Sequence, residues 1–205
     1  MKTVSDGKHH EEYDFINVDS LAPDPADYAE QNRLVGCHDV PARRMIGAWR
    51  WPLVWEYRNK IIPMIQGRYA LDWGGAAGPI GYGAVVVDRG SPYQGFRTLE
   101  EVEPGAHCIF TSHTLEHVVD LGWCLHGLIL KLAPHGRLII HVPGWRIPNL
   151  REENWPHHYQ TFCLSGETEA PEHYTRLDTL LSGYGNLDTC MDDSRGNILA
   201  ILKLS

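Results

Sequence analysis

The feature that most constrains the fold is a strand–helix–strand unit in the second half of the chain. Ala106–Ser112 and Arg137–Val142 are apolar runs that predict strands. Between them, apolar side chains recur at helical spacing over Leu121–Leu132, and Asp120 is placed to cap that helix. Two strands joined in one sheet through a helix lie parallel with a right-handed crossover. The unit therefore predicts an α/β fold built on a parallel sheet.

Four further segments extend this sheet. Arg68–Asp72 and Gly83–Asp88 are predicted strands, and the continuous β-branched run of the second is typical of a strand covered on both faces. Asn186–Met191 and Asn197–Leu204 are separated by only five residues, which is too few for a parallel crossover. We therefore expect a Rossmann-like, mostly parallel sheet with helices on both faces and a C-terminal antiparallel hairpin.

The N-terminal part of the chain differs in character from the rest. Residues 1–40 are polar and acidic and predict an arm or lid, which leaves residues 41–205 for one α/β domain. Helical character begins near Pro41. Within Ala42–Gln66, Pro52 and Pro63 predict a division into two helices.

A glycine-rich turn joins the first two predicted strands. Gly74, Gly75 and Gly78 let the backbone approach a ligand at the carboxyl end of a strand, where open α/β sheets bind their ligands. Asp88 ends the next strand and can accept two hydrogen bonds from a ribose diol. The glycine spacing does not fit the G-x-G-x-x-G pattern of dinucleotide-binding proteins, which disfavours a nicotinamide-dependent enzyme.

The turn, Asp72-Trp73-Gly74-Gly75-Ala76-Ala77-Gly78, resembles motif I of the class I S-adenosylmethionine-dependent methyltransferases, with alanine in place of the middle glycine. The run Ser112–Asp120 (SHTLEHVVD) resembles the end of the fourth strand of that family. Leu132–Gly136 (LAPHG) and His141–Pro143 (HVP) then follow in the order of the family. The likeness, closest to the type 11 methyltransferases, covers residues 65–205.

The resemblance implies that the chain binds S-adenosylmethionine, and seven residues match positions that contact the cofactor. These are Asp72, Gly74, Gly75, Gly78, Asp88, Ser112 and His113. The first four belong to the motif I turn, which faces the methionine moiety. Asp88 matches the acid that holds the ribose, and the last two match the segment at the sulfonium end.

Two departures from the family pattern give weight to an alternative. Only nine residues separate Gly78 from Asp88, which leaves almost no room for the first crossover helix. No third strand and no adenine-contacting acid is evident between Ser91 and Pro104. The alternative is a catalytically degenerate protein of the methyltransferase fold that acts in binding or as a scaffold.

The run His113-x-x-Glu116-His117 also fits the H-x-x-E-H pattern of one zinc-hydrolase class, in which two histidines at i and i+4 share a metal. That chemistry needs the motif on one helix and a further carboxylate ligand downstream. Here a predicted strand precedes the motif, and no glutamate follows Glu172. We therefore expect no metal, and we expect His117 to pack beside the cofactor strand.

The segment Trp145–Phe162 follows the fifth strand and is rich in aromatic side chains and histidine. We expect four of its residues to bind the substrate: Trp145, Trp155, His157 and Tyr159. A packed loop with its own aromatic core is the equally weighted alternative. Because the pKa of histidine lies near about 6.5, His113 and His158 are the expected catalytic bases.

Composition limits the partners. The net charge of −8 argues against nucleic acid, whose phosphates need a basic face. Five scattered cysteines without a CxxC pair indicate reduced thiols, and no signal peptide or membrane-spanning run is evident. We therefore expect a cytoplasmic methyltransferase that methylates an oxygen or nitrogen of a small molecule or sugar without a membrane partner, and a homodimer is allowed.

Overall fold

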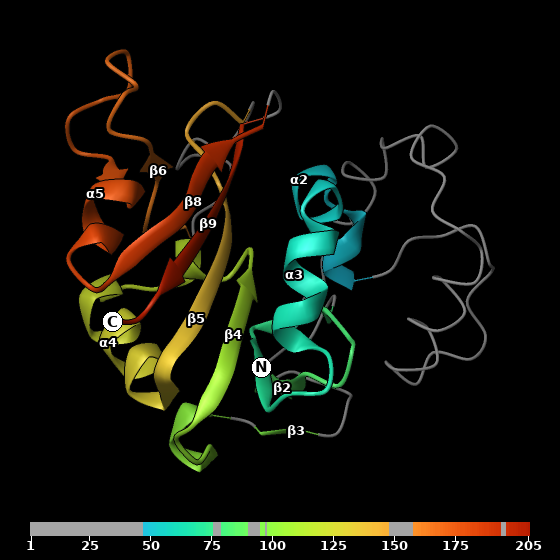
Figure 1. Cartoon of the computed structure of the whole chain (residues 1–205). Coiled ribbons are helices and arrows are strands. Elements are labelled where there is room, and N and C mark those ends of the chain that lie inside the picture. The colour runs from blue at the N-terminus through green and yellow to red at the C-terminus, as the bar shows by residue number, and fades with distance from the viewer. Residues whose placement is uncertain (1–46, 76–78, 90–94, 97, 148–157, 194–195) are drawn as a thin grey trace, which may run out of the picture.

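A seven-stranded sheet forms the centre of the structure (Figure 1). The computed structural model describes residues 47–75, 79–89, 95–96, 98–147, 158–193 and 196–205. The strands are β1 (Ala70–Trp73), β2 (Val85–Val87), β3 (Gly95–Phe96), β4 (Ala106–Ser112), β5 (Leu132–Pro143), β8 (Asn186–Asp192) and β9 (Asn197–Lys203). The predicted N-terminal arm and the helix start near Pro41 lie outside the described residues.

The strand order is β3-β2-β1-β4-β5-β9-β8. The first five strands in this order pair in parallel, whereas β9 runs antiparallel to both β5 and β8. The predicted mostly parallel sheet with a C-terminal antiparallel hairpin is therefore confirmed. A separate pair, β6 (Phe162–Cys163) and β7 (Thr175–Arg176), is also parallel.

Helices cover both faces of the sheet, as predicted. Helices α2 (Pro52–Glu56) and α3 (Arg58–Ile65) lie on one side, and α4 (Leu121–Lys131) and α5 (Leu177–Ser182) lie on the other (Figure 1). Three short 3-10 helices complete the described elements: η2 (Gly47–Arg50), η4 (Leu99–Glu101) and η5 (Leu115–His117).

The apolar core has two parts because the central strands are buried on both faces. Along β4, Ile109 faces the part beneath α4, whereas Cys108 and Phe110 face the part beneath α2 and α3. In β5, Leu138 likewise faces the part beneath α4, and Ile139 faces the part beneath α2 and α3. The period of two residues along a strand produces this alternation, and it explains why the strand sequences are continuously apolar.

Three details differ from the sequence expectations or fill gaps in them. The break between α2 and α3 falls at Tyr57 rather than at Pro63, which lies inside α3 near its end. Strand β3, which was not predicted, contains only Gly95 and Phe96 and is too short for a hydrophobic pattern. Between β1 and β2 the described residues contain no α-helix, in agreement with the short spacing from Gly78 to Asp88.

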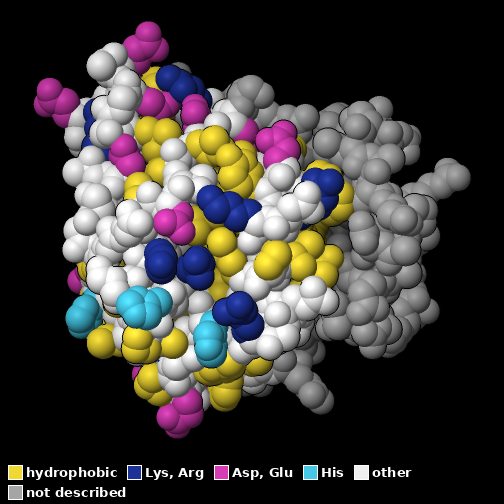
Figure 2. All heavy atoms as spheres, in the orientation of Figure 1, with side chains coloured by type: hydrophobic (Ala, Val, Ile, Leu, Met, Phe, Trp, Pro, Cys, Tyr) yellow, Lys and Arg dark blue, Asp and Glu magenta, His cyan; other side chains and the backbone are white. Residues whose placement is uncertain are grey.

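The surface carries charges of both signs. On the face shown in Figure 2, acidic side chains gather mainly toward the upper end, and basic ones lie across the middle among apolar side chains. Among the helices that the structure describes, none has the length and apolar character needed to cross a membrane.

Helix α4 begins with the predicted cap. The Asp120 side chain accepts a hydrogen bond from the backbone N–H of Trp123 at 2.9 Å. This satisfies one of the backbone donors that a helix start leaves open.

Replacing Asp120 by alanine should lower the free energy of unfolding by about 1 kcal/mol, because the donor at the helix start loses its acceptor. Asp120→Asn should retain most of that stability, since asparagine caps about as well as aspartate. Urea denaturation of the wild type and both variants measures the difference. Equal losses in the two variants would contradict the capping role.

Candidate functional site

The turn after β1 is shaped by contacts within the chain. Gly74 has a φ of +82°, a conformation that favours glycine, and its N–H donates to the Val87 carbonyl at 3.0 Å. A Cβ on Gly74 would overlap the Thr114 side chain, and one on Gly75 would lie 2.5 Å from Asp72 Oδ2. Both glycines are therefore required by neighbouring side chains of the same chain.

Asp72 holds this turn from inside. Its side chain is buried, and Oδ2 accepts a hydrogen bond from the Ile80 N–H at 2.6 Å. The Ile80 carbonyl in turn accepts from Trp49 Nε1 at 2.6 Å, so the turn is also tied to η2. Burial raises the pKa of Asp72 to about 7, opposed by the Ile80 hydrogen bond and reinforced by the negative charge of Asp88.

A cavity of about 720 Å³ opens at the carboxyl ends of β1 and β2. Gly74, Asp88 and Thr114 line it at these strand ends, and Gly127, Leu130 and Lys131 line it further along α4. Its volume is in the range of small-molecule sites, about 300–1,000 Å³. Its place at the carboxyl ends of parallel strands is where open α/β sheets bind ligands.

Of the seven residues matched to the cofactor, Gly74 and Asp88 line this cavity. Asp72, Gly75, Ser112 and His113 do not line it, and Gly78 lies outside the described residues. The contacts of these seven residues with a cofactor remain predictions.

Sequence reasoning missed several residues of the cavity. Thr98, Leu99 and Glu100 line it at η4, directly after the two-residue strand β3. Trp123 also lines it and is 70% exposed. A tryptophan outside the apolar stripe of the predicted α4 was a signal in the sequence, whereas nothing in the pattern pointed to Leu99.

A second group of polar side chains lies at the ends of β4 and β5. We call it the histidine cluster, and it consists of His113, Glu116, His117, His141 and His158. Its first three members come from the segment that follows β4, and His141 lies on β5. The topology places these ends side by side, because β4 and β5 pair in parallel and Ser112 is the partner of His141.

His113 and His141 are fixed by ring contacts. The ring of His113 stacks on Trp51 with centroids 4.1 Å apart, and the rings of His113 and His141 lie 4.9 Å apart. His141 Nδ1 lies 2.9 Å from Ser112 Oγ. The His141 side chain is fully buried, and burial lowers its pKa to about 3, so its ring is neutral. Trp51, just before α2, was not predicted to be part of the site.

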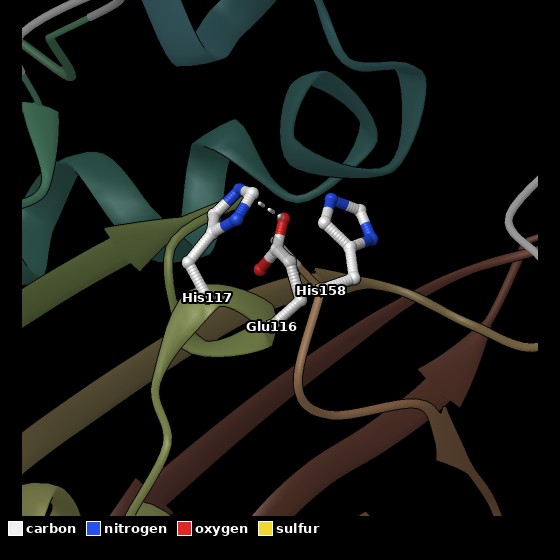
Figure 3. A group of neighbouring side chains, drawn as sticks. All are labelled: Glu116, His117 and His158. Atoms are coloured by element: carbon white, nitrogen blue, oxygen red, sulfur yellow. Dashed lines mark ion pairs between the residues drawn. The ribbon is translucent and has the colours of Figure 1, made fainter. Parts of the chain in front are cut away.

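Glu116 occupies the middle of the cluster. Its side chain is 1% exposed, and Oε1 lies 3.5 Å from His113 Nδ1 and 3.9 Å from His117 Nε2. Burial raises the pKa of this carboxyl group to about 8. His117 and His158 face Glu116 from two sides (Figure 3), with their rings 4.6 Å apart.

The H-x-x-E-H interpretation would need His113 and His117 on one helix. His113 instead has a φ of +51° at the end of β4, and η5 begins only at Leu115. The two histidines therefore do not form the helical i, i+4 pair of that zinc-hydrolase class.

The four predicted substrate residues are only partly described. Trp145 follows β5, and its backbone N–H donates to the Phe162 carbonyl at 2.9 Å. Tyr159 is 55% exposed, and its backbone N–H donates to the Glu116 carbonyl at 2.7 Å. Trp155 and His157 lie outside the described residues. A role in substrate binding remains a prediction for all four.

The buried His141 should make stability depend on pH. Its pKa is lower in the folded than in the unfolded protein, so the folded state binds fewer protons and its stability falls as pH drops below about 6.5. The stability advantage of the wild type over His141→Asn should therefore shrink by about 2 kcal/mol between pH 7.5 and pH 5. Urea denaturation at the two pH values measures it.

Asp72→Asn is the matched comparison, and its sign is opposite. The pKa of Asp72 is higher in the folded than in the unfolded protein, so its stabilising contribution is lost as pH rises toward about 7. The advantage of the wild type over Asp72→Asn should grow on going from pH 7.5 to pH 5. A pH-independent difference for either variant would contradict the burial of that group.

Known structures share this architecture, although no family model and no curated protein matches the sequence. A protein of echinomycin biosynthesis, which converts a disulfide bond into a thioacetal group, aligns with 75% of this chain and 82% of its own at 14% identity and a TM-score of 0.51. An S-adenosylmethionine-dependent methyltransferase from Mesorhizobium loti aligns over 73% and 97% at 12% identity and a TM-score of 0.49.

The CurJ carbon methyltransferase aligns with 74% of this chain at 14% identity and a TM-score of 0.47, and the chain spans only 52% of that protein. Sequence identities of 12–14% are evidence of a shared fold but not of a shared function. Together with the strand order, the alignment with the echinomycin-biosynthesis protein shows that the chain has a Rossmann-like fold with a C-terminal antiparallel part.

Proposed function

We propose that this chain binds S-adenosylmethionine in the cavity beside Asp88 and transfers its methyl group to a small-molecule acceptor. The observation that carries the proposal is the cavity itself, because it opens at the carboxyl ends of β1 and β2 and has the volume of a ligand site. The fold supplies the context in which such a cavity holds an adenosyl group.

The residues around the cavity suit the adenosyl part of the cofactor. Asp88 stands at the end of β2, where a carboxylate can accept both hydrogen bonds of a ribose diol. Leu99 and Trp123 offer apolar surface for a base, and Glu100 offers an acceptor beside them. We therefore propose that Glu100 is the adenine-contacting acid, which the sequence pattern between Ser91 and Pro104 did not reveal.

The bound cofactor supplies a methyl group on a sulfonium, whose departure leaves a neutral thioether. The task of the protein is then to align the acceptor and exclude water, and a base is needed only where the acceptor loses a proton. We propose His113 and His158 for that role. His113 is held between the Trp51 ring and the Glu116 carboxyl group, which fixes its orientation.

The acceptor is proposed to be an oxygen or nitrogen of a small molecule or sugar. One similar structure takes part in the biosynthesis of echinomycin, which is a small-molecule context. Trp145, Trp155, His157 and Tyr159 follow β5 in the chain, and we propose that they contact the acceptor.

A second candidate function rests on a specific observation. Thr114 and the Asp72 carboxylate fill the positions beside Gly74 and Gly75 that a methionine moiety would approach. The second candidate is a protein of the same fold that binds the adenosyl group but transfers no methyl group, and that acts in binding or as a scaffold.

Calorimetric titration with S-adenosylhomocysteine tests the cofactor site. Asp88→Ala should weaken binding by about 10–100-fold, because hydrogen bonds to a charged group contribute about 1.5–3 kcal/mol. Asp188→Ala, which removes a carboxylate from β8, is the control and should bind as the wild type does.

Absence of binding by the wild type, or equal affinity of Asp88→Ala and wild type, would contradict the proposed site. Binding of S-adenosylhomocysteine without methyl transfer to any acceptor tested would favour the second candidate.

A further inference from the structure

Three metal-ligating side chains converge outside the proposed cofactor cavity. One ligand atom each from Glu116, His117 and His158 lies within 4.8 Å of the other two (Figure 3). None of the three lines the cavity. Two imidazole nitrogens and one carboxylate oxygen form a ligand set that zinc uses in catalytic sites and that also suits ferrous iron.

The burial of Glu116 is the first argument for a cation. Its side chain is 1% exposed, and Oε2 makes no hydrogen bond within the described part of the chain. A buried polar atom without a partner costs free energy. The ion-pair partners that the structure records for Glu116 are the histidines His113 and His117. Coordination of a divalent ion would give Oε2 the partner that it lacks within the described residues.

The backbone holds the three ligands together. The N–H groups of Tyr159 and Gln160 both donate to the Glu116 carbonyl, at 2.7 and 3.1 Å. The Gln160 side chain also donates to the Val118 carbonyl at 3.1 Å. These bonds hold Tyr159 and Gln160 against η5 and against Val118, which follows it. His158 therefore stays beside His117, although the two are far apart in the sequence.

The cluster borders solvent at His117. The His117 side chain is 44% exposed, whereas Glu116 is buried, so an ion can reach the carboxylate from solvent past the imidazole. Tetrahedral zinc holds its ligand atoms about 3.3 Å apart. Side-chain rotation of the exposed His117 and the half-buried His158 is required to bring the atoms to that spacing. Three protein ligands then leave one position for water or a substrate.

We propose that Glu116, His117 and His158 bind one divalent transition-metal ion of the Zn²⁺ and Fe²⁺ class. The site differs from the H-x-x-E-H arrangement, because His158 takes the place of His113. It also departs from the sequence analysis, which expected no metal. The inference goes beyond the proposed function and does not depend on methyl transfer. A metal-bound His158 uses its ring nitrogen as a ligand, so the role of base then belongs to His113 alone.

Calorimetry on the metal-stripped full chain tests the site. The wild type should bind one equivalent of Zn²⁺ at this site, and Fe²⁺ under anaerobic conditions, but not Mg²⁺, which prefers oxygen ligands. Glu116→Gln, His117→Ala and His158→Ala should each weaken Zn²⁺ binding by at least about 100-fold, the upper end of losses seen for residues that only support a ligand. His126→Ala removes an exposed histidine of α4 and should change nothing.

Two results would overturn the proposal: no binding of Zn²⁺ or Fe²⁺ by the wild type, or binding that persists in all three variants as it does in His126→Ala. Circular dichroism of each variant shows whether it is folded. His117→Ala is the most informative variant, because truncation of an exposed side chain leaves the core intact. The cofactor titration uses other residues, so the two proposals can fail separately.

Discussion

Burial of the central strands on both faces is the constraint on which the rest of the structure depends. Leu71 on β1, Ile109 on β4 and Ile139 on β5 are fully buried between two layers of helices. A polar side chain on either face would lose its hydration, so polar groups concentrate where the strands end. Asp72 and His141, two of the buried polar side chains on the strands, show the cost, since burial moves the pKa of both far from their usual values.

The segment after β4 divides the polar region into two parts. Thr114 lines the cavity beside Gly74 and Asp88. Its neighbour His113 has a positive φ, and its ring stacks on Trp51, in the histidine cluster. One short turn therefore separates the cavity proposed for the adenosyl group from the cluster proposed for proton transfer or metal binding. The proposed donor and acceptor chemistry would meet at this turn.

Much of the fold could be predicted because its signals are local or periodic. The helical spacing over α4 predicts a parallel crossover, and the link of only four residues between β8 and β9 allows only a hairpin; the structure confirms both. The two-residue strand β3 could not be found, because it is too short to have a period. The break at Tyr57 was also missed, since no proline or glycine marks it.

The site was less predictable, because it depends on contacts between distant segments. The motif I turn was found from its glycines, but their dependence on Thr114 and Asp72 is visible only in three dimensions. In the same way, His158 meets His117 only through the bonds of Tyr159 and Gln160 to the Glu116 carbonyl. From the sequence spacing, the metal-ligand pair that was considered consisted of His113 and His117 instead.

A crystal structure of the chain grown with S-adenosylhomocysteine tests the central claim most directly. We expect the adenosine between Gly74 and Leu99, with both ribose hydroxyls within hydrogen-bond distance of the Asp88 carboxylate. Electron density for the ligand at another place, or an empty cavity at saturating concentration, would contradict the account.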